Sequence, residues 1–205
     1  VISITTGKNK TKQNKTIERD AAYDTTMHQL SESLCNRTIY LQNKLQTLNN
    51  TNNETLTRIQ NLSTKAEQAK ALQKWYSAAS FCFNANVQSF YLFAQESNAS
   101  QQRINETIEN IQTNIITLDK ILGKKQKTTI TDLEAFIVVV ERLTEAVKQK
   151  DEFIENNDTN LYTLAYAHER VFSAFSWYKF FDHRGKALKI DERSLKESCK
   201  QKIAE

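Results

Sequence analysis

The stretch from Gln73 to Gln95 reads QKWYSAASFCFNANVQSFYLFAQ and decides the fold. It holds seven aromatic residues within about six helical turns, and small residues such as Ala78 and Ala79 stand between them. A helix that is apolar on nearly every side is surrounded by other helices, because bulky rings gain by burial and small residues admit neighbouring backbones. We therefore predict that this stretch is the central helix of an all-α protein. Its aromatic residues at helical spacing indicate packing rather than ligand binding.

The composition of the chain favours long helices and excludes some functions. The 205 residues suit one domain with a sizeable core, and the absence of Pro together with only three Gly leaves few helix breakers. The net charge of +4 comes from basic residues that are mixed with acidic ones, which does not predict nucleic-acid binding. Because no apolar run reaches about 18 residues, we expect membrane attachment only through segments outside this chain.

The N-terminal residues differ from the rest of the chain. Residues 1–16 contain a short strand-like segment at Ile2 to Ile4, then Gly7 and a polar link rich in Lys and Asn. This pattern predicts a linker or the end of an upstream domain. Residues 17–205 are predicted to form one antiparallel bundle of about six helices.

Apolar stripes predict two helices before the central one. The first helix begins at Thr16 or Asp20, and its stripe is interrupted only at Arg37 and Thr38. The second runs from Leu56 to Ala69, and either continues into the central helix or bends near residues 70–74. The stripe of the first helix consists of Tyr23, Met27, Leu30, Leu34, Leu41, Leu45 and Leu48.

The second half of the chain predicts four more helical segments. A heptad-like stripe ends before Gly123 and favours packing within a bundle over a dimeric coiled coil. Thr131 to Glu134 is predicted to cap the next helix, the aromatic stretch Leu161 to Phe181 is predicted to face the central helix, and Asp191 begins a basic last helix. The stripes are Ile104, Ile108, Ile111, Ile115, Leu118 and Leu122; then Leu133, Phe136, Ile137, Val140, Leu143, Val147 and Ile154; and, in the last helix, Leu195, Cys199 and Ile203.

Asparagine gives an indication of the compartment. The acceptor sequence for N-glycosylation, Asn-x-Ser/Thr, recurs well above the number of about three that 18 Asn and 34 Ser or Thr would produce by chance. Glycans attach to surface positions of secreted proteins, so the excess predicts an extracellular or cell-surface protein, whereas a bias toward Asn and Thr is the simpler alternative. The candidates are Asn14, Asn36, Asn49, Asn53, Asn61, Asn98, Asn105 and Asn157.

The three cysteines leave their pairing open. Cys35, Cys82 and Cys199 lie far apart and lack Cys-x-x-Cys spacing, so no metal site is predicted. In an oxidising compartment two of them can pair and leave one thiol, but the sequence does not choose among the three pairings. Cys82 also fits a small buried apolar residue of the central helix.

No catalytic motif occurs in the chain. His168 lies on an apolar face, where a core histidine with its hydrogen bonds satisfied, or one bonded to Tyr or Ser, is expected rather than a catalytic one. His28 and His183 share no metal-ligand spacing with it. The pairs Glu141-Arg142 and Glu169-Arg170 lie inside apolar helices and predict a partly buried salt-bridge network between helices. No cofactor is predicted.

Several segments together resemble a known family. They are Thr6-Gly7-Lys8, Tyr23, Leu34 to Thr38, Trp75 to Asn86 (WYSAASFCFNAN), Glu141-Arg142-Leu143 and Ala165 to Phe181 (AYAHERVFSAFSWYKFF). This set resembles the helical region that follows the protease domain in archaeal secreted or membrane-anchored Lon-like serine peptidases. The family's Ser-Lys dyad belongs to the preceding domain, so the resemblance assigns no catalytic residue to this chain. The family pattern leads us to expect a Gly-containing turn before Tyr76, where this chain has Gln73-Lys74-Trp75.

The resemblance implies a non-catalytic accessory domain of an extracytoplasmic Lon-like peptidase. Its role would be assembly, placement near a membrane or control of substrate access, and its partner would be the upstream protease domain, another protein or a second copy of the chain. The alternative function is a free-standing glycosylated helical module for surface interaction or adhesion. A third, weaker hypothesis is an enzyme that uses buried Tyr, His168 and acidic residues of the bundle.

Overall fold

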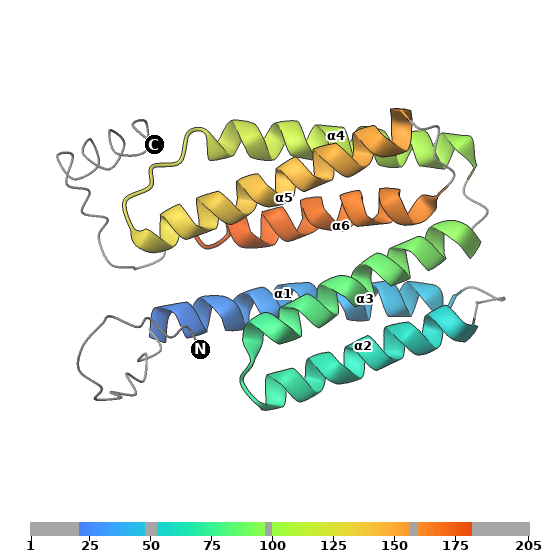
Figure 1. Ribbon diagram of the computed structural model, residues 1–205, viewed down its shortest axis with the longest axis horizontal. Coiled ribbons are helices and arrows are strands. Elements are labelled where there is room, and N and C mark those ends of the chain that lie inside the picture. The colour runs from blue at the N-terminus through green and yellow to red at the C-terminus, as the bar shows by residue number, and fades with distance from the viewer. Residues whose placement is uncertain (1–20, 48–52, 97–99, 156–159, 182–205) are drawn as a thin grey trace, which may run out of the picture.

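The computed structural model describes residues 21–47, 53–96, 100–155 and 160–181, and these residues form a bundle of antiparallel helices (Figure 1). The all-α prediction is confirmed, and no strand occurs within these four ranges. The predicted strand-like segment at Ile2 to Ile4 and the last helix from Asp191 lie outside the described residues. The helices are α1 (Ala21–Leu45), α2 (Asn53–Ala71), α3 (Trp75–Glu96), α4 (Gln101–Leu122), α5 (Ile130–Glu155) and α6 (Leu161–Tyr178).

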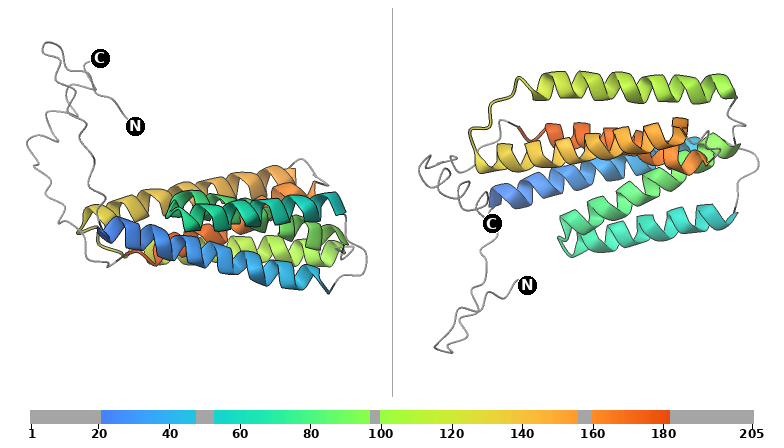
Figure 2. Two further views of the ribbon diagram at one scale, coloured as in Figure 1. Left: turned by 90° about the horizontal axis from the view of Figure 1, so that it is seen from below. Right: turned by 45° about the horizontal axis from the view of Figure 1, so that its top comes forward.

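The helices form two groups of three that meet along α3 and α6. Helix α3 packs against α1 and α2, while α6 packs against α5 and α4 (Figures 1 and 2). Contacts of α6 with α3 and α1 join the two groups. The predicted pairing of the two aromatic helices is confirmed by three ring pairs: Phe83 with Tyr166, Phe90 with His168 and Tyr91 with Tyr162.

The buried face of α3, the central helix, consists largely of small residues. Ala78 and Ala85 are completely buried, whereas Trp75 and Phe81 are half-buried and Tyr76 is 57% exposed. Small side chains let the backbones of α1 and α3 approach closely, so most of the rings extend sideways toward neighbouring helices. The prediction of a central helix is therefore right, but the reason is close packing through alanine as much as burial of rings.

The bend between α2 and α3 depends on Gln73. Its φ of 53° lies in the left-handed region, which glycine usually occupies at the end of a helix. The amide of Lys74 donates to the Ala69 carbonyl and that of Gln73 donates to the Lys70 carbonyl, both at 2.8 Å. These two bonds form a Schellman motif. Of the two alternatives that the sequence left open, the bend near residues 70–74 is therefore the one present, with glutamine in a conformation that glycine usually adopts.

One prediction about α5 is wrong and another is only partly right. Its first turn is capped by Thr129 and Asp132, which bond reciprocally to each other's backbone amides at 2.9 and 3.0 Å, so the capping box begins two residues before Thr131. In the predicted stripe, Leu143 is buried and Phe136 and Val147 pack against the core. The other edge of the stripe is misplaced, because Ile137, Val140 and Ile154 are exposed. The helix buries a face of smaller and polar residues instead, because its neighbours approach it closely. This face consists of Asp132, Ala135, Val139, Leu143, Ala146, Lys150 and Phe153.

The stripe of α4 is confirmed and turns toward the bundle. Ile111, Ile115, Leu118 and Leu122 are buried, and α4 packs against α5 and α6. This arrangement is the bundle packing that the heptad spacing favours.

The helices alternate in direction, so the bundle has two distinct ends (Figure 2). The described chain begins at Ala21 and ends at Phe181 at the same end, which we call the proximal end. The connections between α2 and α3 and between α4 and α5 also lie there (Figure 1). The other three connections join helix ends at the opposite, distal end.

Candidate functional site

A group of polar side chains lies where α1, α3 and α6 meet; we call Arg37, Thr38, Asn86, His168 and Glu169 the buried cluster. Glu169 is completely buried and accepts two hydrogen bonds from Arg37, at 2.9 Å from Nη2 and 3.4 Å from Nε. Nδ1 of His168 lies 3.0 Å from the same carboxylate. A buried carboxylate is stable only when charged and hydrogen-bonding partners surround it, and here both partners are present.

The surroundings of Glu169 favour its charged form. Burial by itself raises the pKa of the Glu169 carboxyl, but the hydrogen bonds and charges of His168 and Arg37 outweigh burial. Its pKa therefore lies below the ordinary value of 4.5. Phe90 stacks on the His168 ring at 4.1 Å, and the Arg37 guanidinium lies 4.8 Å from the centre of the Phe172 ring. These contacts fix the side chains of Arg37, His168 and Glu169 in place.

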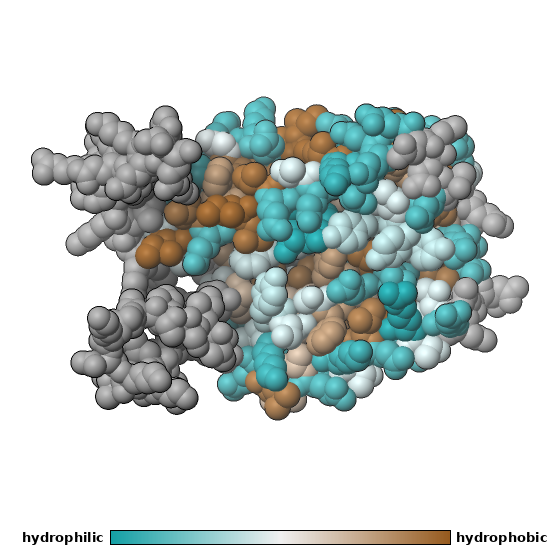
Figure 3. All heavy atoms as spheres, in the orientation of Figure 1, coloured by the Kyte–Doolittle hydropathy of each residue, from teal (hydrophilic) through white to brown (hydrophobic). Residues whose placement is uncertain are grey.

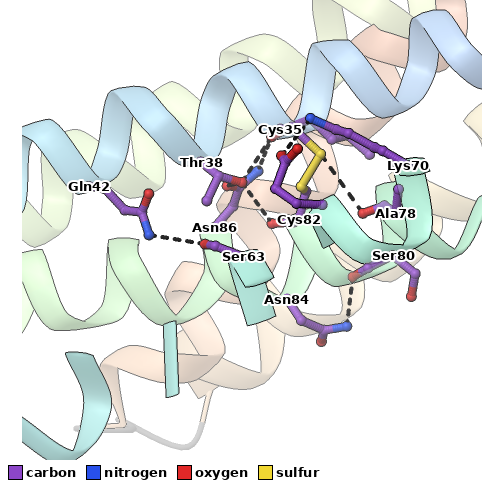
Figure 4. The surroundings of a disulfide bond; sticks show 12 residues. Cys35, Thr38, Gln42, Ser63, Lys70, Ala78, Ser80, Cys82, Asn84 and Asn86 are labelled. Atoms are coloured by element: carbon purple, nitrogen blue, oxygen red, sulfur yellow. Dashed lines mark hydrogen bonds and ion pairs between the residues drawn. A yellow bond between two sulfur atoms is a disulfide. The ribbon is translucent and has the colours of Figure 1, made fainter. Parts of the chain in front are cut away.

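The other two residues of the buried cluster join α1 to α3. Thr38 Oγ1 donates to Asn86 Oδ1 at 2.7 Å, and Asn86 Nδ2 donates to the Leu34 carbonyl at 3.0 Å (Figure 4). Both side chains are buried. The interruption of the first apolar stripe at Arg37 and Thr38 therefore marks the point where α1 contributes polar contacts to the core.

A disulfide lies beside this cluster and joins the same two helices. Cys35 of α1 is bonded to Cys82 of α3, with 5.0 Å between their Cα atoms (Figure 4). Both residues are buried. Of the three pairings left open by the sequence, the structure contains this one, and Cys199 lies outside the described residues.

The second candidate site is a groove between α3 and α5, with a volume of about 310 Å³. We call it the charged groove. Its deep part is apolar, its walls carry charges of both signs, and the exposed Tyr76 stands at its rim. The deep residues include Leu30, Leu34, Phe83 and Trp177, and the charged or hydroxyl-bearing wall residues include Glu141, Arg142, Glu145, Tyr166 and Arg170.

Ion pairs in the charged groove link α5 to α6. Arg170 Nε lies 2.7 Å from Glu145 Oε2, and Arg142 Nη1 lies 3.5 Å from the same oxygen and 3.6 Å from Glu141. Arg170 Nη2 also donates to the Tyr166 hydroxyl. Among the described residues, however, Glu145 Oε2 and the Nε atoms of both arginines have no aligned hydrogen bond. The groove is thus charged and close-packed but less completely bonded than the buried cluster.

The predicted salt-bridge network is present, with partners that the sequence order does not suggest. Glu169 bonds to Arg37 of α1, whereas its neighbour Arg170 bonds to Glu145 of α5. Of the two predicted pairs, Glu141 and Arg142 are the one whose members contact each other. Arg37 and Glu145 were absent from the predicted pairs because nothing in the sequence indicates that α6 packs against α1 and α5.

The arrangement gives no support to catalysis or metal binding. His168 contacts a carboxylate, as a catalytic histidine would, but its ring is stacked on Phe90 and its carboxylate is held by Arg37. The expected partner of His168, a Tyr or Ser, is replaced by Glu169. In the four described ranges, no group of three His, Cys, Asp or Glu side chains could hold a metal ion, and no helix there is long and apolar enough to cross a membrane.

The predicted glycosylation positions fall into two sets. Asn36, Asn61 and Asn105 are exposed on α1, α2 and α4, as acceptor sites require. Asn53 begins α2 at the distal end, but its side chain lies outside the description. Asn14, Asn49, Asn98 and Asn157 also lie outside the described residues, as does Asn9, which belongs to one more acceptor sequence, Asn9-Lys10-Thr11.

Comparisons of the chain with protein-family models, curated protein sequences and solved structures give no match.

Proposed function

We propose that this chain is a non-catalytic helical accessory domain that binds protein outside the cytoplasm, as part of a Lon-like serine peptidase. The peptidase assignment is supported by the sequence resemblance over Trp75 to Asn86 and Ala165 to Phe181. In that setting the domain assembles the peptidase, places it near a membrane or shapes substrate access.

The main support for a non-catalytic function is that α6 directs His168 and Glu169 toward α1 and α3. His168 and Glu169, the residues best suited to acid–base chemistry, are bonded to each other and to Arg37 or stacked on Phe90. They do not line the charged groove. A general base must reach a substrate proton, so these residues serve to hold α6 against α1 and α3.

The compartment is supported by two independent features. Disulfides form and persist mainly in oxidising environments, and Cys35 and Cys82 are bonded across α1 and α3. The exposed acceptor asparagines Asn36, Asn61 and Asn105 are consistent with glycosylation in such a compartment.

The charged groove is the surface we assign to the protein partner. It combines an apolar interior, arginines of the kind enriched at protein interfaces and an exposed tyrosine, Tyr76, at its rim.

The test is binding of this chain to the protease domain encoded with it. We expect the coding sequence before Val1 to specify a Ser-Lys peptidase domain, and that domain to bind the 205-residue chain in titration calorimetry. Tyr76→Ala should weaken binding at least about tenfold, as loss of an interface tyrosine does. Tyr40→Ala is the matched control, because Tyr40 is similarly exposed but does not line the groove. Equal weakening by both variants would contradict the assignment of the groove.

The free-standing adhesion module is the second candidate function, and the exposed acceptor asparagines favour it equally. A signal peptide encoded directly before Val1 would replace the peptidase proposal with this one. An unchanged mass of the native protein after enzymatic deglycosylation would contradict the glycosylation part of both.

A further inference from the structure

The two ends of the bundle differ in charge. The proximal connections, residues 72–74 and 123–129, and the chain after α6, residues 179–181, contain Lys74, Lys124, Lys125, Lys127 and Lys179 and no acidic residue. The distal connections, residues 46–52, 97–100 and 156–160, contain no Lys or Arg and one acidic residue, Asp158. All five cationic side chains of these segments therefore lie at the end where the described chain begins and ends.

Three of these lysines are well placed for contact with a partner. Lys74, Lys124 and Lys179 are exposed, while Lys125 and Lys127 are half-buried and lie over the rings of Tyr178 and Phe136. Each of these lysines is attached to a helix end or a short connection that the bundle holds in place. Their charges thus lie toward the same end of the bundle, although the α2–α3 turn that carries Lys74 stands back from the start of α5 (Figure 1).

Large apolar side chains accompany the lysines. Leu72, in the turn between α2 and α3, is 65% exposed, and Ile130 at the start of α5 is 43% exposed. The surface view shows apolar side chains over the first turns of α5, toward the proximal end (Figure 3). Single exposed apolar residues are common on protein surfaces, but beside lysines they also suit a membrane interface, where apolar groups enter the acyl boundary and lysines meet anionic headgroups.

We propose that the proximal end of the bundle binds the surface of an anionic lipid membrane, with Lys74, Lys124 and Lys179 at the headgroups and Leu72 inserted at the interface. This goes beyond the expectation that membrane contact lies only outside this chain. If the proposal holds, the domain itself binds the membrane, at a surface different from the charged groove that binds the protein partner.

The test is co-sedimentation of the 205-residue chain with lipid vesicles at about 0.15 M salt. We expect binding to vesicles of phosphatidylcholine with about one third phosphatidylglycerol, weak binding to phosphatidylcholine alone, and release at high salt. Lys74→Gln with Lys124→Gln should weaken binding roughly 25-fold, from about fivefold per lysine near an anionic surface. Leu72→Ser should weaken it several-fold at every salt concentration, because the lost term is apolar.

Matched variants show whether vesicle binding depends on the proximal lysines or on the net charge of the whole chain. Arg103→Gln with Lys148→Gln removes the same charge from exposed positions in the distal half of the bundle and should leave vesicle binding within about twofold of the unchanged protein. Equal effects of the proximal and distal pairs overturn the proposal, since charge alone would then explain binding. Failure to sediment with any vesicle also overturns it and leaves an acidic protein surface as the matching partner. Binding to the protease domain is measured without vesicles, so either proposal can fail alone.

Discussion

Glu169 and Arg170 are neighbours on α6, yet they belong to two differently built ionic regions. Glu169 is completely buried, with bidentate bonds from Arg37 and a third contact from His168. Arg170 lies in the charged groove, 2.7 Å from Glu145, in a pair that lacks hydrogen-bond alignment. The same residue types thus form a fully bonded cluster on one side of the helix and an incompletely bonded one on the other.

The difference indicates what each region does. Charges enclosed in a protein are tolerated only with well-aligned partners, and removing one partner leaves the other at high cost. Charges at a partly open surface contribute little to stability and remain able to exchange partners. We infer that the buried cluster specifies how α6 docks on α1 and α3, whereas the charged groove is suited to binding.

The largest expected effect comes from the covalent bond beside the buried cluster. Replacing Cys35 and Cys82 by alanine should lower the free energy of unfolding by about 4 kcal/mol, because the disulfide closes a loop of 47 residues in the unfolded chain. Urea unfolding followed by circular dichroism measures the change. Cys199→Ala is the control and should leave stability unaltered, while a loss below about 1 kcal/mol in the double variant would argue against the bond.

The comparison between the two ionic regions can be tested directly. Glu169→Gln should lower the free energy of unfolding by about 3 kcal/mol, because the charge is removed from a completely buried position and Arg37, which is 17% exposed, loses its counter-charge. Glu145→Gln in the charged groove should cost less, about 1 kcal/mol, since Glu145 is 37% exposed, although its partner Arg170 is only 12% exposed. Both are measured by the same urea experiment. Similar losses in the two variants would remove the distinction between the regions.

Acid should weaken the buried cluster in a predictable direction. The pKa of Glu169 in the folded protein lies below the ordinary value of 4.5, so its contribution is complete above pH 4.5 and is lost as the pH falls through the folded-state pKa. Comparison of urea unfolding at pH 7 with unfolding below pH 4.5 tests this. On acidification, the Glu169→Gln variant should lose less free energy of unfolding than the unchanged protein. An equal loss in both would mean that other carboxyl groups cause the acid sensitivity.

The smallest expected effect is at Gln73, which lies outside both ionic regions, so its variant shows how much a change of backbone conformation alone alters stability. Gln73→Gly should raise the free energy of unfolding by about 0.5 to 1 kcal/mol, because glycine adopts the left-handed backbone of this turn without the steric cost that Cβ imposes. The gain is measured as an increase in the urea midpoint at unchanged slope. Gln68→Gly, within α2, is the control and should destabilise the protein by a similar amount.

Periodicity was sufficient to predict most of the architecture. The helices and the contact between α3 and α6 follow from apolar spacing and from the matching aromatic content of two stretches, whereas the bend near residues 70–74 was one of two alternatives that the sequence left open. The stripe of α5 was only partly right, because Ile137 and Val140 are large and apolar but exposed, while Ala135, Ala146 and Lys150 share the buried face with Leu143. Large apolar residues do not identify the buried face of a helix where its neighbours come so close that the face must be built from alanine.

The candidate site was harder to predict because it depends on which helices face each other. Glu169 and Arg170 could be singled out as charged residues in an apolar helix, but Arg37 and Glu145 are distant in sequence. The one local signal was the interruption of the apolar stripe of α1 at Arg37 and Thr38. A polar gap in an otherwise apolar stripe marks a buried polar contact when the helix continues through it.

The burial of Thr38 has a consequence for the order of events in biosynthesis. Thr38 is the third residue of the acceptor sequence that begins at Asn36, and its hydroxyl is bonded to Asn86 in the core. An enzyme that recognises both residues finds the hydroxyl occupied once α1 has packed on α3, although Asn36 itself stays exposed. A glycan at Asn36 would therefore have to be attached before α1 packs on α3, so its attachment would compete in time with the folding of these two helices.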